Sequence, residues 1–347
     1  MTTMAERTHT TSGSASEPAS GTRTLTLGKA VNEGLRAALR HDDKVMLMGE
    51  DIGPLGGVFR VTDGLQAEFG EQRVVDTPLA ESGIIGTAIG LAMRGYRPVC
   101  EIQFDGFVFP AFNQITTQLA KIHNRTRGAV SVPVVIRIPY GGGIGAVEHH
   151  SESPEALFAH TAGLRVVSPS NPQDAYTMIQ EAIACPDPVV FFEPKGRYWS
   201  KGAVDLDAPV GSATLDAAQV VRAGTDVTLV AYGPSVETAL KTAEALAAEG
   251  RSAEVLDLRA VSPIDTAAVV ASVRKTGRCV VIHEAPVFFG SGAEIAARVT
   301  EECFYALEAP VLRVGGFHTP YPVAKHEHDY LPSVDRVLDA VDRAFAH

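Results

Sequence analysis

The sequence predicts an α/β protein made of two three-layer domains, each with a mostly parallel sheet covered by helices on both faces. Three observations support this fold class. The chain has 347 residues, of which 45% are hydrophobic, and this length suits two domains better than one. Short β-branched runs alternate with segments whose apolar residues recur at helical spacing. The connections between them are short, as in parallel sheets built from strand–helix–strand units.

The first domain is expected over residues 24–194. Val132–Ile138 is a β-branched run typical of a strand that is buried on both faces. Ser82–Met93 has the small residues of a closely packed helix, and Phe107–His123 carries an apolar stripe. The other expected helices are Leu27–Leu39 and Pro172–Ala184, and the other expected strands are Val45–Met48, Pro98–Gln103, Leu164–Val167 and Val189–Phe192.

The second domain is expected over residues 218–347, after a polar, irregular linker at residues 195–217. Its alternation of strands and helices is cleaner than that of the first domain. The helix at Ser235–Glu249, for example, places Val236 and Leu240 on one face. Further helices are expected at Asp265–Lys275, Gly292–Leu307 and Ser333–Phe345, and strands at Asp226–Ala231, Ala253–Leu258, Cys279–His283 and Val311–Val314.

Composition excludes several classes of function. The formal net charge of −11 argues against nucleic acid as a partner, because phosphate backbones require a basic surface. The longest apolar stretch, Gly83–Met93, is too short to span a membrane. The four cysteines form no CxxC pair, which favours free buried thiols in a reducing compartment.

The N-terminal residues 1–23 are rich in Ser, Thr, Gly and Ala and lack the apolar core of a secretion signal. They are expected to form a disordered leader, with an organelle transit peptide as the alternative. A soluble cytoplasmic protein is therefore expected, and the mitochondrial matrix is the other location considered.

Two motifs suggest ligands but have simpler explanations. Gly141–Gly145 follows a strand, as a phosphate-binding loop would, but it runs into Val147–His150 and not into a helix. A structural glycine loop is favoured there. Lys325–Asp329 contains residue types that ligate metals, but a solvated charged turn is the favoured interpretation.

Glu81 is the first candidate for catalysis. It follows a strand end and a Pro turn, and it opens an almost wholly apolar, small-residue helix. Apolar neighbours disfavour the charged form of a carboxylate, so the group can keep a proton and donate it to a basic ring nitrogen. Acids also favour the first turn of a helix because of the helix dipole. The pattern alone does not decide between catalysis and capping.

His150 is the second candidate. It lies in the segment His149–Glu155, after a strand that is predicted to be buried, where ligands gather in α/β sheets. A histidine at such a position can act as an acid or a base near neutral pH. The pattern alone slightly favours a histidine that merely satisfies its hydrogen bonds with nearby Ser and Glu residues.

Seven stretches extend these two sites into a family pattern. They are Met48–Asp51 (MGED), Asp76–Glu81 (DTPLAE), Glu101–Phe104 (EIQF), His150–Ala156 (HSESPEA), Val189–Lys195 (VVFFEPK), His283–Pro286 (HEAP) and Leu307–Val314 (LEAPVLRV). In this order and spacing they resemble the β subunit of the thiamine-diphosphate-dependent decarboxylating component of 2-oxoacid dehydrogenase complexes. The resemblance runs from about Thr24 to the C-terminus.

This resemblance implies a transketolase-like pyrimidine-binding domain followed by a domain like the C-terminal domain of transketolase. Thiamine diphosphate would lie between an α and a β subunit, with Mg²⁺ and the diphosphate held by the α subunit. The α chains carry a Gly-Asp-Gly motif for that purpose, and this sequence has none. By the resemblance, Glu81 hydrogen-bonds the aminopyrimidine, and Leu79, Gln103 and Phe107 line its pocket. Branched-chain relatives often have Tyr at the position of Phe107.

The resemblance also assigns other groups. His150 matches a histidine thought to assist reductive acylation of the lipoyl group. The register of the following Ser-Glu-Ser-Pro favours His150 over His149. K⁺ is implied through carbonyl oxygens around Val134, Val135, Ala182, Cys185 and Asp187. The implied partners are an α subunit, in an assembly of two α and two β chains, and the lipoyl acyltransferase core.

Three classes of function remain open from the sequence. A branched-chain 2-oxoacid dehydrogenase is favoured by Gln103 and by the Ser-Pro-Glu-Ala, Phe-Phe-Glu-Pro-Lys and His-Glu-Ala-Pro stretches, with pyruvate or acetoin dehydrogenase as the alternative. A nicotinamide-dependent dehydrogenase is disfavoured because the glycine fingerprint is incomplete. A non-catalytic scaffold that docks the acyltransferase core is the third class, and the second domain is expected to serve docking within an enzyme too.

Overall fold

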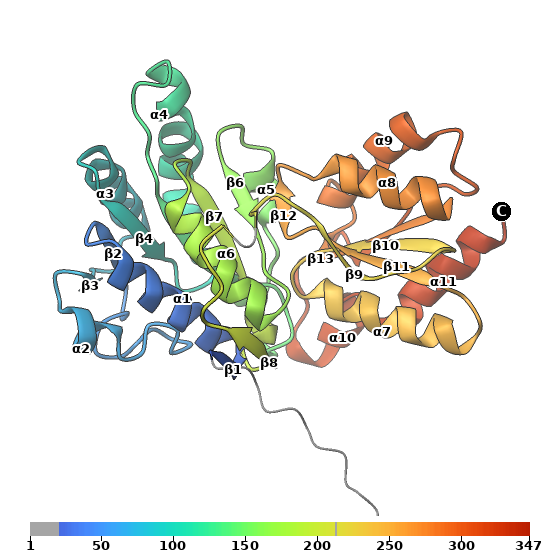
Figure 1. The fold of residues 1–347 in the computed structure, drawn as a ribbon, viewed down its shortest axis with the longest axis horizontal. Helices are drawn as coiled ribbons and strands as arrows, with labels where there is room; N and C mark the ends of the chain where they lie inside the picture. Colours follow the sequence, from blue (N-terminus) through green and yellow to red (C-terminus); the bar gives the residue numbers. More distant parts are fainter. Residues whose placement is uncertain (1–20, 212–213) are drawn as a thin grey trace, which may run out of the picture.

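The computed structural model describes residues 21–211 and 214–347, which form two α/β domains side by side (Figure 1). Within these residues the first sheet has seven strands, in the order β12 (Ala260–Ser262), β6 (Arg165–Val167), β7 (Val189–Pro194), β5 (Val135–Tyr140), β4 (Arg97–Glu101), β2 (Val45–Gly49) and β3 (Val74–Asp76). Among them, β12 alone runs antiparallel to its neighbour. Strands β5 and β7 are buried at every residue, as expected for parallel strands covered on both faces.

Helices cover both faces of this sheet. On one face, α1 (Leu27–His41) packs closely against α6 (Pro172–Ala184). Gly34 permits this approach, because a Cβ atom there would lie 2.8 Å from the carbonyl oxygen of Tyr176. The other face is covered by α3 (Glu81–Met93), η1 (Asp105–Ala111), η2 (Gln114–Leu119) and α4 (Ala120–Arg125).

The helix expected over Phe107–His123 is not one regular helix. The segment is divided into the 3₁₀ helix η1, the π-helical turn η2 and the α-helix α4. Pro110 lies inside η1, where it cannot donate a backbone hydrogen bond. Thr116 and Thr117 each donate a side-chain hydrogen bond to the carbonyl four residues earlier, which competes with regular helix geometry.

The second domain confirms the predicted three-layer arrangement. Its sheet has the order β14 (Leu312–Gly316), β13 (Cys279–Pro286), β10 (Val227–Ala231), β11 (Ala253–Asp257) and β9 (Gln219–Arg222). The strands are parallel except β9, which runs antiparallel to β11. Helices α7 (Ser235–Ala248) and α11 (Val334–Phe345) cover one face, and α8 (Thr266–Thr276) and α9 (Ser291–Cys303) cover the other.

The boundary between the domains is more ordered than the sequence predicts. Residues 195–217, expected to be irregular, contain η4 (Lys195–Arg197) and β8 (Lys201–Asp205), and β8 pairs with β1 (Thr22–Thr26). Thr22 and Arg23 therefore belong to a strand and not to a leader, whereas residues 1–20 lie outside the described residues. The remaining short helices are α2 (Leu65–Phe69), η3 (Glu148–His150), α5 (Glu155–Ala159), η5 (Ala324–His326) and α10 (Glu327–Tyr330).

Two findings in the described part of the chain concern its apolar helices and its cysteines. No helix there is long and apolar enough to cross a bilayer. All four cysteines are free, and Cys100, Cys279 and Cys303 are buried, while Cys185 is half-buried. Burial raises the pKa of the Cys279 thiol to about 12, so it stays a protonated, unreactive packing group.

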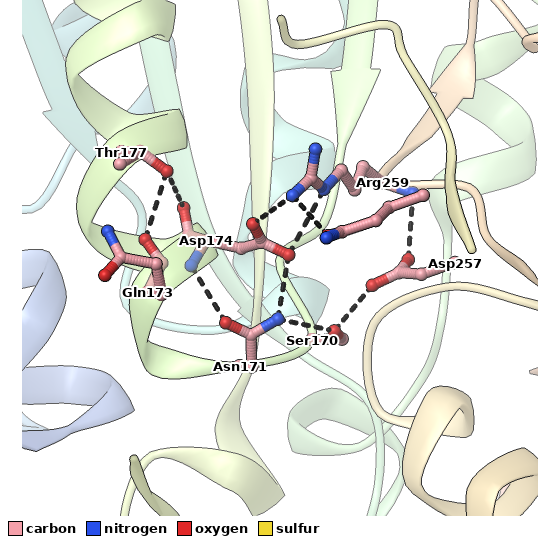
Figure 2. A network of polar contacts seen from close by, with 8 residues as sticks. Ser170, Asn171, Gln173, Asp174, Thr177, Asp257 and Arg259 are labelled. Atoms are coloured by element: carbon pink, nitrogen blue, oxygen red, sulfur yellow. Dashed lines mark hydrogen bonds and ion pairs between the residues drawn. The ribbon is translucent and has the colours of Figure 1, made fainter. Parts of the chain in front are cut away.

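A polar network joins the two domains beside β12 (Figure 2). Arg259, in the left-handed region with φ of 58°, donates two hydrogen bonds to the carboxylate of Asp174 at the start of α6. Asp257, at the end of β11, accepts 2.6 Å from the Ser170 hydroxyl and 3.0 Å from the Arg259 backbone N–H. The network therefore holds β12 at the edge of the first sheet.

The Asp257→Asn substitution is expected to stabilise the protein at about pH 8 by about 1–3 kcal/mol and to have less effect at about pH 5. Burial raises the pKa of Asp257 to about 7, with the Asp174 charge acting in the same direction. The folded protein thus binds a proton that the unfolded chain releases, so Asp257 lowers stability as the pH rises from about 4 to about 7. The asparagine oxygen can still accept from the Arg259 backbone N–H, and its uncharged amide can donate to the Ser170 hydroxyl, which then becomes the acceptor. Denaturant unfolding at the two pH values measures the difference in free energy of unfolding between the variant and the wild type. An equal difference at both pH values would contradict the prediction.

Candidate active site

Glu81 lies at the carboxyl edge of the first sheet, where ligands gather in parallel α/β folds. It is the first residue of α3, as the sequence predicts, and it is half-buried. The preceding turn is fixed because the Thr77 N–H donates 2.9 Å to the Gly49 carbonyl. The Gly53 N–H also donates to the Asp76 carboxylate, at 2.5 Å. The ends of β2 and β3 are thereby tied together beneath Glu81.

A second acid, Glu50, lies close to Glu81. Its pKa is raised by burial first, and then by the charges of Asp51 and Glu81. The side chain of Gln103 donates 3.4 Å to the Asp51 carboxylate, so the Gln103 amide belongs to the same cluster. No role was predicted for Glu50, although the Met48–Asp51 stretch that contains it was among the family motifs.

This site is open on one side. Leu79 is 71% exposed, and α3 presents Gly83, Gly86 and Gly90 to the surface, so a largely apolar helix has an uncovered face. The Thr77 hydroxyl is buried and has no hydrogen-bond partner among the described residues. These features suit the binding of a flat ring with polar edges. The glycines of α3 and the Leu79 side chain would contact the ring, the Thr77 hydroxyl could form a hydrogen bond, and a second chain could cover the open side.

His150 lies in η3, beside the aromatic side chains that follow β4. Its ring contacts Phe104 edge to face at a centroid distance of 4.3 Å, and Phe107 at 5.4 Å. Burial lowers the pKa of His150, and the Lys195 charge lowers it further. The imidazole is therefore neutral at neutral pH and can accept a proton. His149 is exposed to solvent, whereas His150 is half-buried.

A buried ion pair below His150 was not predicted. The Lys195 ammonium lies 2.7 Å from the Asp105 carboxylate, and both side chains are fully buried. Asp105 also accepts 2.9 Å from the Glu152 backbone N–H, two residues after His150. Burial raises the pKa of Asp105 to about 6 and lowers that of Lys195. Because the partners lie on separate segments, the sequence offered no local signal for the pair.

The residues expected to surround K⁺ lie around the start of β5 and the end of α6. The guanidinium of Arg97 occupies part of this region and donates to the carbonyls of Ile183 at 2.8 Å and Ala184 at 3.3 Å. Arg165 pairs with the Asp187 carboxylate at 3.1 Å. Residues 21–211 and 214–347 contain no cluster of three or more His, Cys, Asp or Glu residues arranged for a metal. K⁺ binding remains a prediction.

Comparison with known proteins identifies the family. Residues 23–200 match the pyrimidine-binding domain of transketolase, and residues 216–337 match the transketolase C-terminal domain. The pyruvate dehydrogenase E1 component subunit beta of Leifsonia xyli is 65% identical over 95% of this chain and 98% of its own length. The chain belongs to the E1 β subunits of 2-oxoacid dehydrogenases. The 3-methyl-2-oxobutanoate dehydrogenase subunit beta of Mycobacterium tuberculosis is 54% identical over 93% of this chain and 92% of its own length.

The fold of this E1 β subunit also resembles a solved structure described as a split-gene transketolase, inactive β4 tetramer. The TM-score is 0.77, and the match covers 93% of this chain and 98% of the other at 24% identity. At that identity the likeness shows the fold alone. Membership of the E1 β family implies dependence on thiamine diphosphate and on an α-subunit partner. The open side of the Glu81 site fits both requirements.

Proposed function

We propose that this E1 β subunit, together with an α subunit, oxidatively decarboxylates pyruvate and transfers the acyl group to the lipoyl group of an acyltransferase core. The choice of pyruvate follows the relative at 65% identity and replaces the branched-chain preference expected from the sequence. A branched-chain 2-oxoacid is the second candidate, because the Mycobacterium tuberculosis relative at 54% identity bears that name. Bacterial relatives favour a cytoplasmic location.

The observation that carries this proposal is the half-site at Glu81. Glu81 would hydrogen-bond the aminopyrimidine ring, Leu79, Gln103 and Phe107 would line its pocket, and the Thr77 hydroxyl is free to bond. When bound, thiamine diphosphate supplies a carbon nucleophile and an electron sink. The α subunit would contribute Mg²⁺ and the diphosphate site, in an assembly of two α and two β chains.

His150 would act when the acyl group passes to the lipoyl disulfide. Burial and the Lys195 charge keep its ring neutral at neutral pH, so a ring nitrogen could take the proton that is released as the acyl group forms and deliver it to the lipoyl sulfur that leaves. The edge-to-face contacts with Phe104 and Phe107 limit how the ring can turn. This leaves Glu81 and His150 with separate roles in two successive half-reactions.

Reconstitution with the α subunit tests the proposal. The pair is expected to turn over pyruvate with a kcat/KM at least about tenfold higher than that for 2-oxoisovalerate, because a pyruvate enzyme would have a pocket that fits a methyl group and excludes a branched chain. Release of CO₂ from each substrate measures the ratio. A reversed ratio would transfer the assignment to the branched-chain candidate. An assembled pair that decarboxylates neither substrate would instead favour a scaffold that only docks the core.

A further inference from the structure

The loop that carries His150 has an unusual backbone. Residues 141–152 leave β5 and return to its end, where the Gly141 N–H donates 3.0 Å to the Glu152 carbonyl and closes the loop. Gly141, Gly143 and Gly145 have φ angles of 80°, 90° and 70°, which side-chain-bearing residues rarely adopt. Backbone conformations that alternate in this way point successive N–H groups toward the same hollow, and such a hollow can bind an anion.

The anion in this hollow is a side chain of the second domain. Both oxygens of Glu327, at the start of α10, accept hydrogen bonds: 2.9 Å from the Gly143 N–H and 3.1 Å from the Gly145 N–H. The Tyr321 hydroxyl donates 2.8 Å to the same carboxylate. Glu284, in β13, accepts 2.9 Å from the Gly142 N–H. Carboxylates of the protein itself therefore accept from the backbone N–H groups of the glycine loop. This agrees with the prediction that the loop is structural and does not bind phosphate.

The same contacts revise the expectation for Lys325–Asp329. His326 and Asp329 are exposed and pair with each other at 3.1 Å, as expected for a solvated turn. Glu327 differs from them, because it is only 4% exposed and faces the glycine loop. Two motifs that are far apart in the sequence therefore form one contact between the domains.

On its other side the loop rests on the first domain. A Cβ atom at Gly196 would lie 2.7 Å from the Gly142 carbonyl oxygen, and one at Gly106 would lie 2.6 Å from the His149 carbonyl oxygen. The charges of Glu284 and Glu327 also act on Lys195, which in turn acts on His150. The loop therefore lies between Gly106 and Gly196 of the first domain and two carboxylates of the second.

We infer that Glu327 and Glu284 are positioning residues for His150. They fix the glycine loop through its backbone N–H groups and so set where the imidazole lies against Phe104 and Phe107. The second domain then takes part in acyl transfer through the backbone of this loop. This inference rests on the proposed role of His150.

The Glu327→Gln substitution tests the inference in the assembled α and β subunits. A glutamine keeps one acceptor but turns an N–H₂ group toward a backbone N–H, so one contact becomes repulsive. Acylation of a free lipoyl domain is expected to fall about ten- to a hundredfold further than decarboxylation followed with an artificial electron acceptor. The pH profile of acylation should shift as well, and amide hydrogen exchange in residues 141–152 should rise.

Two further variants provide a graded series and a control. Tyr321→Phe removes one donor from Glu327 and should shift the same measurements in the same direction by a smaller amount. It also keeps the test available if Glu327→Gln assembles poorly. Glu254→Gln is the matched control, because Glu254 is a buried carboxylate of the same domain that bonds Ser272 and Lys275 far from the loop. It should leave both rates and the loop exchange unchanged.

His150→Ala separates failure of the inference from failure of the proposed function. If His150→Ala loses acylation while Glu327→Gln keeps the wild-type acylation rate, pH profile and loop exchange, the positioning inference is wrong and the role of His150 stands. If His150→Ala keeps wild-type acylation, the proposed role of His150 fails and the inference fails with it. A shared loss of acylation, with faster loop exchange in Glu327→Gln, supports both.

Discussion

The Glu81→Gln substitution is expected to lower the decarboxylation rate of the assembled enzyme by about 10²–10⁴, the range expected for loss of a general acid–base group. Glutamine has nearly the same shape but cannot give a proton to a ring nitrogen. The fold should persist, because Glu81 is half-buried at the first residue of α3. Loss of its interaction with the helix dipole costs only about 0.3–1 kcal/mol. The initial rate of CO₂ release, with the α subunit and saturating cofactor, measures the effect.

A matched control for this substitution is Glu71→Gln, which removes one carboxylate from an exposed position of the same domain, just before β3. Its turnover should equal that of the wild type. Co-purification with the α subunit should also be the same for both variants, which separates catalysis from assembly. Wild-type turnover by Glu81→Gln would favour the scaffold alternative over the enzyme.

The layers of the fold could be predicted because they depend on local patterns. Val132–Ile138 has the β-branched composition of a strand buried on both faces, and β5 is buried at every residue. The start of α3 at Glu81 follows from the Pro turn and the small-residue run after it. Such signals lie within about ten residues of each other, so one sequence is enough to find them.

The local structure at the boundary between the domains could not be predicted, because it depends on contacts between distant segments. Strand β12 has three residues, too few for any periodic pattern, and it joins the first sheet only because β6 offers an open edge. The pairing of β1 with β8 is similar, since each strand alone is a short polar segment. Arg259 has a positive φ angle that favours glycine, and the sequence carries no sign of it.

In the candidate site, too, some features could be predicted from the sequence and others depend on contacts between distant segments. Glu81 and His150 lie in family motifs, so the resemblance identified them and separated His150 from its neighbour His149. The ion pair of Lys195 and Asp105 and the contact of Glu327 with the glycine loop join residues that are far apart in sequence. Their residue types are ordinary for loops, and only the tertiary fold makes them neighbours.

A buried charge network that supports this site is centred on Arg137 in β5. The Arg137 guanidinium forms two hydrogen bonds with the Glu193 carboxylate, at 2.6 and 2.9 Å, and one with Glu101, at 2.7 Å. The Tyr198 hydroxyl also donates to Glu193, at 2.5 Å. The side chain of Arg137 is 2% exposed, so solvent cannot replace these contacts. Three adjacent strands, β4, β5 and β7, are thereby joined just before the segments that carry Gln103 and Lys195.

The Arg137→Met substitution is expected to destabilise the protein by about 3–5 kcal/mol, because it leaves two carboxylates buried without a counter-charge. Burial raises the pKa of Glu101 while Arg137 opposes that rise, so losing Arg137 favours protonation of this carboxyl in the folded state. A group with a raised folded-state pKa lowers stability as the pH rises, and the loss should therefore be smaller at about pH 5 than at about pH 8. Denaturant unfolding of the single variant and of the triple variant Arg137→Met, Glu101→Gln, Glu193→Gln measures the charge effect. The triple variant should recover much of the stability, since no buried charge is left unpaired, whereas a single-variant loss below about 1 kcal/mol would show that the network is not a major contributor.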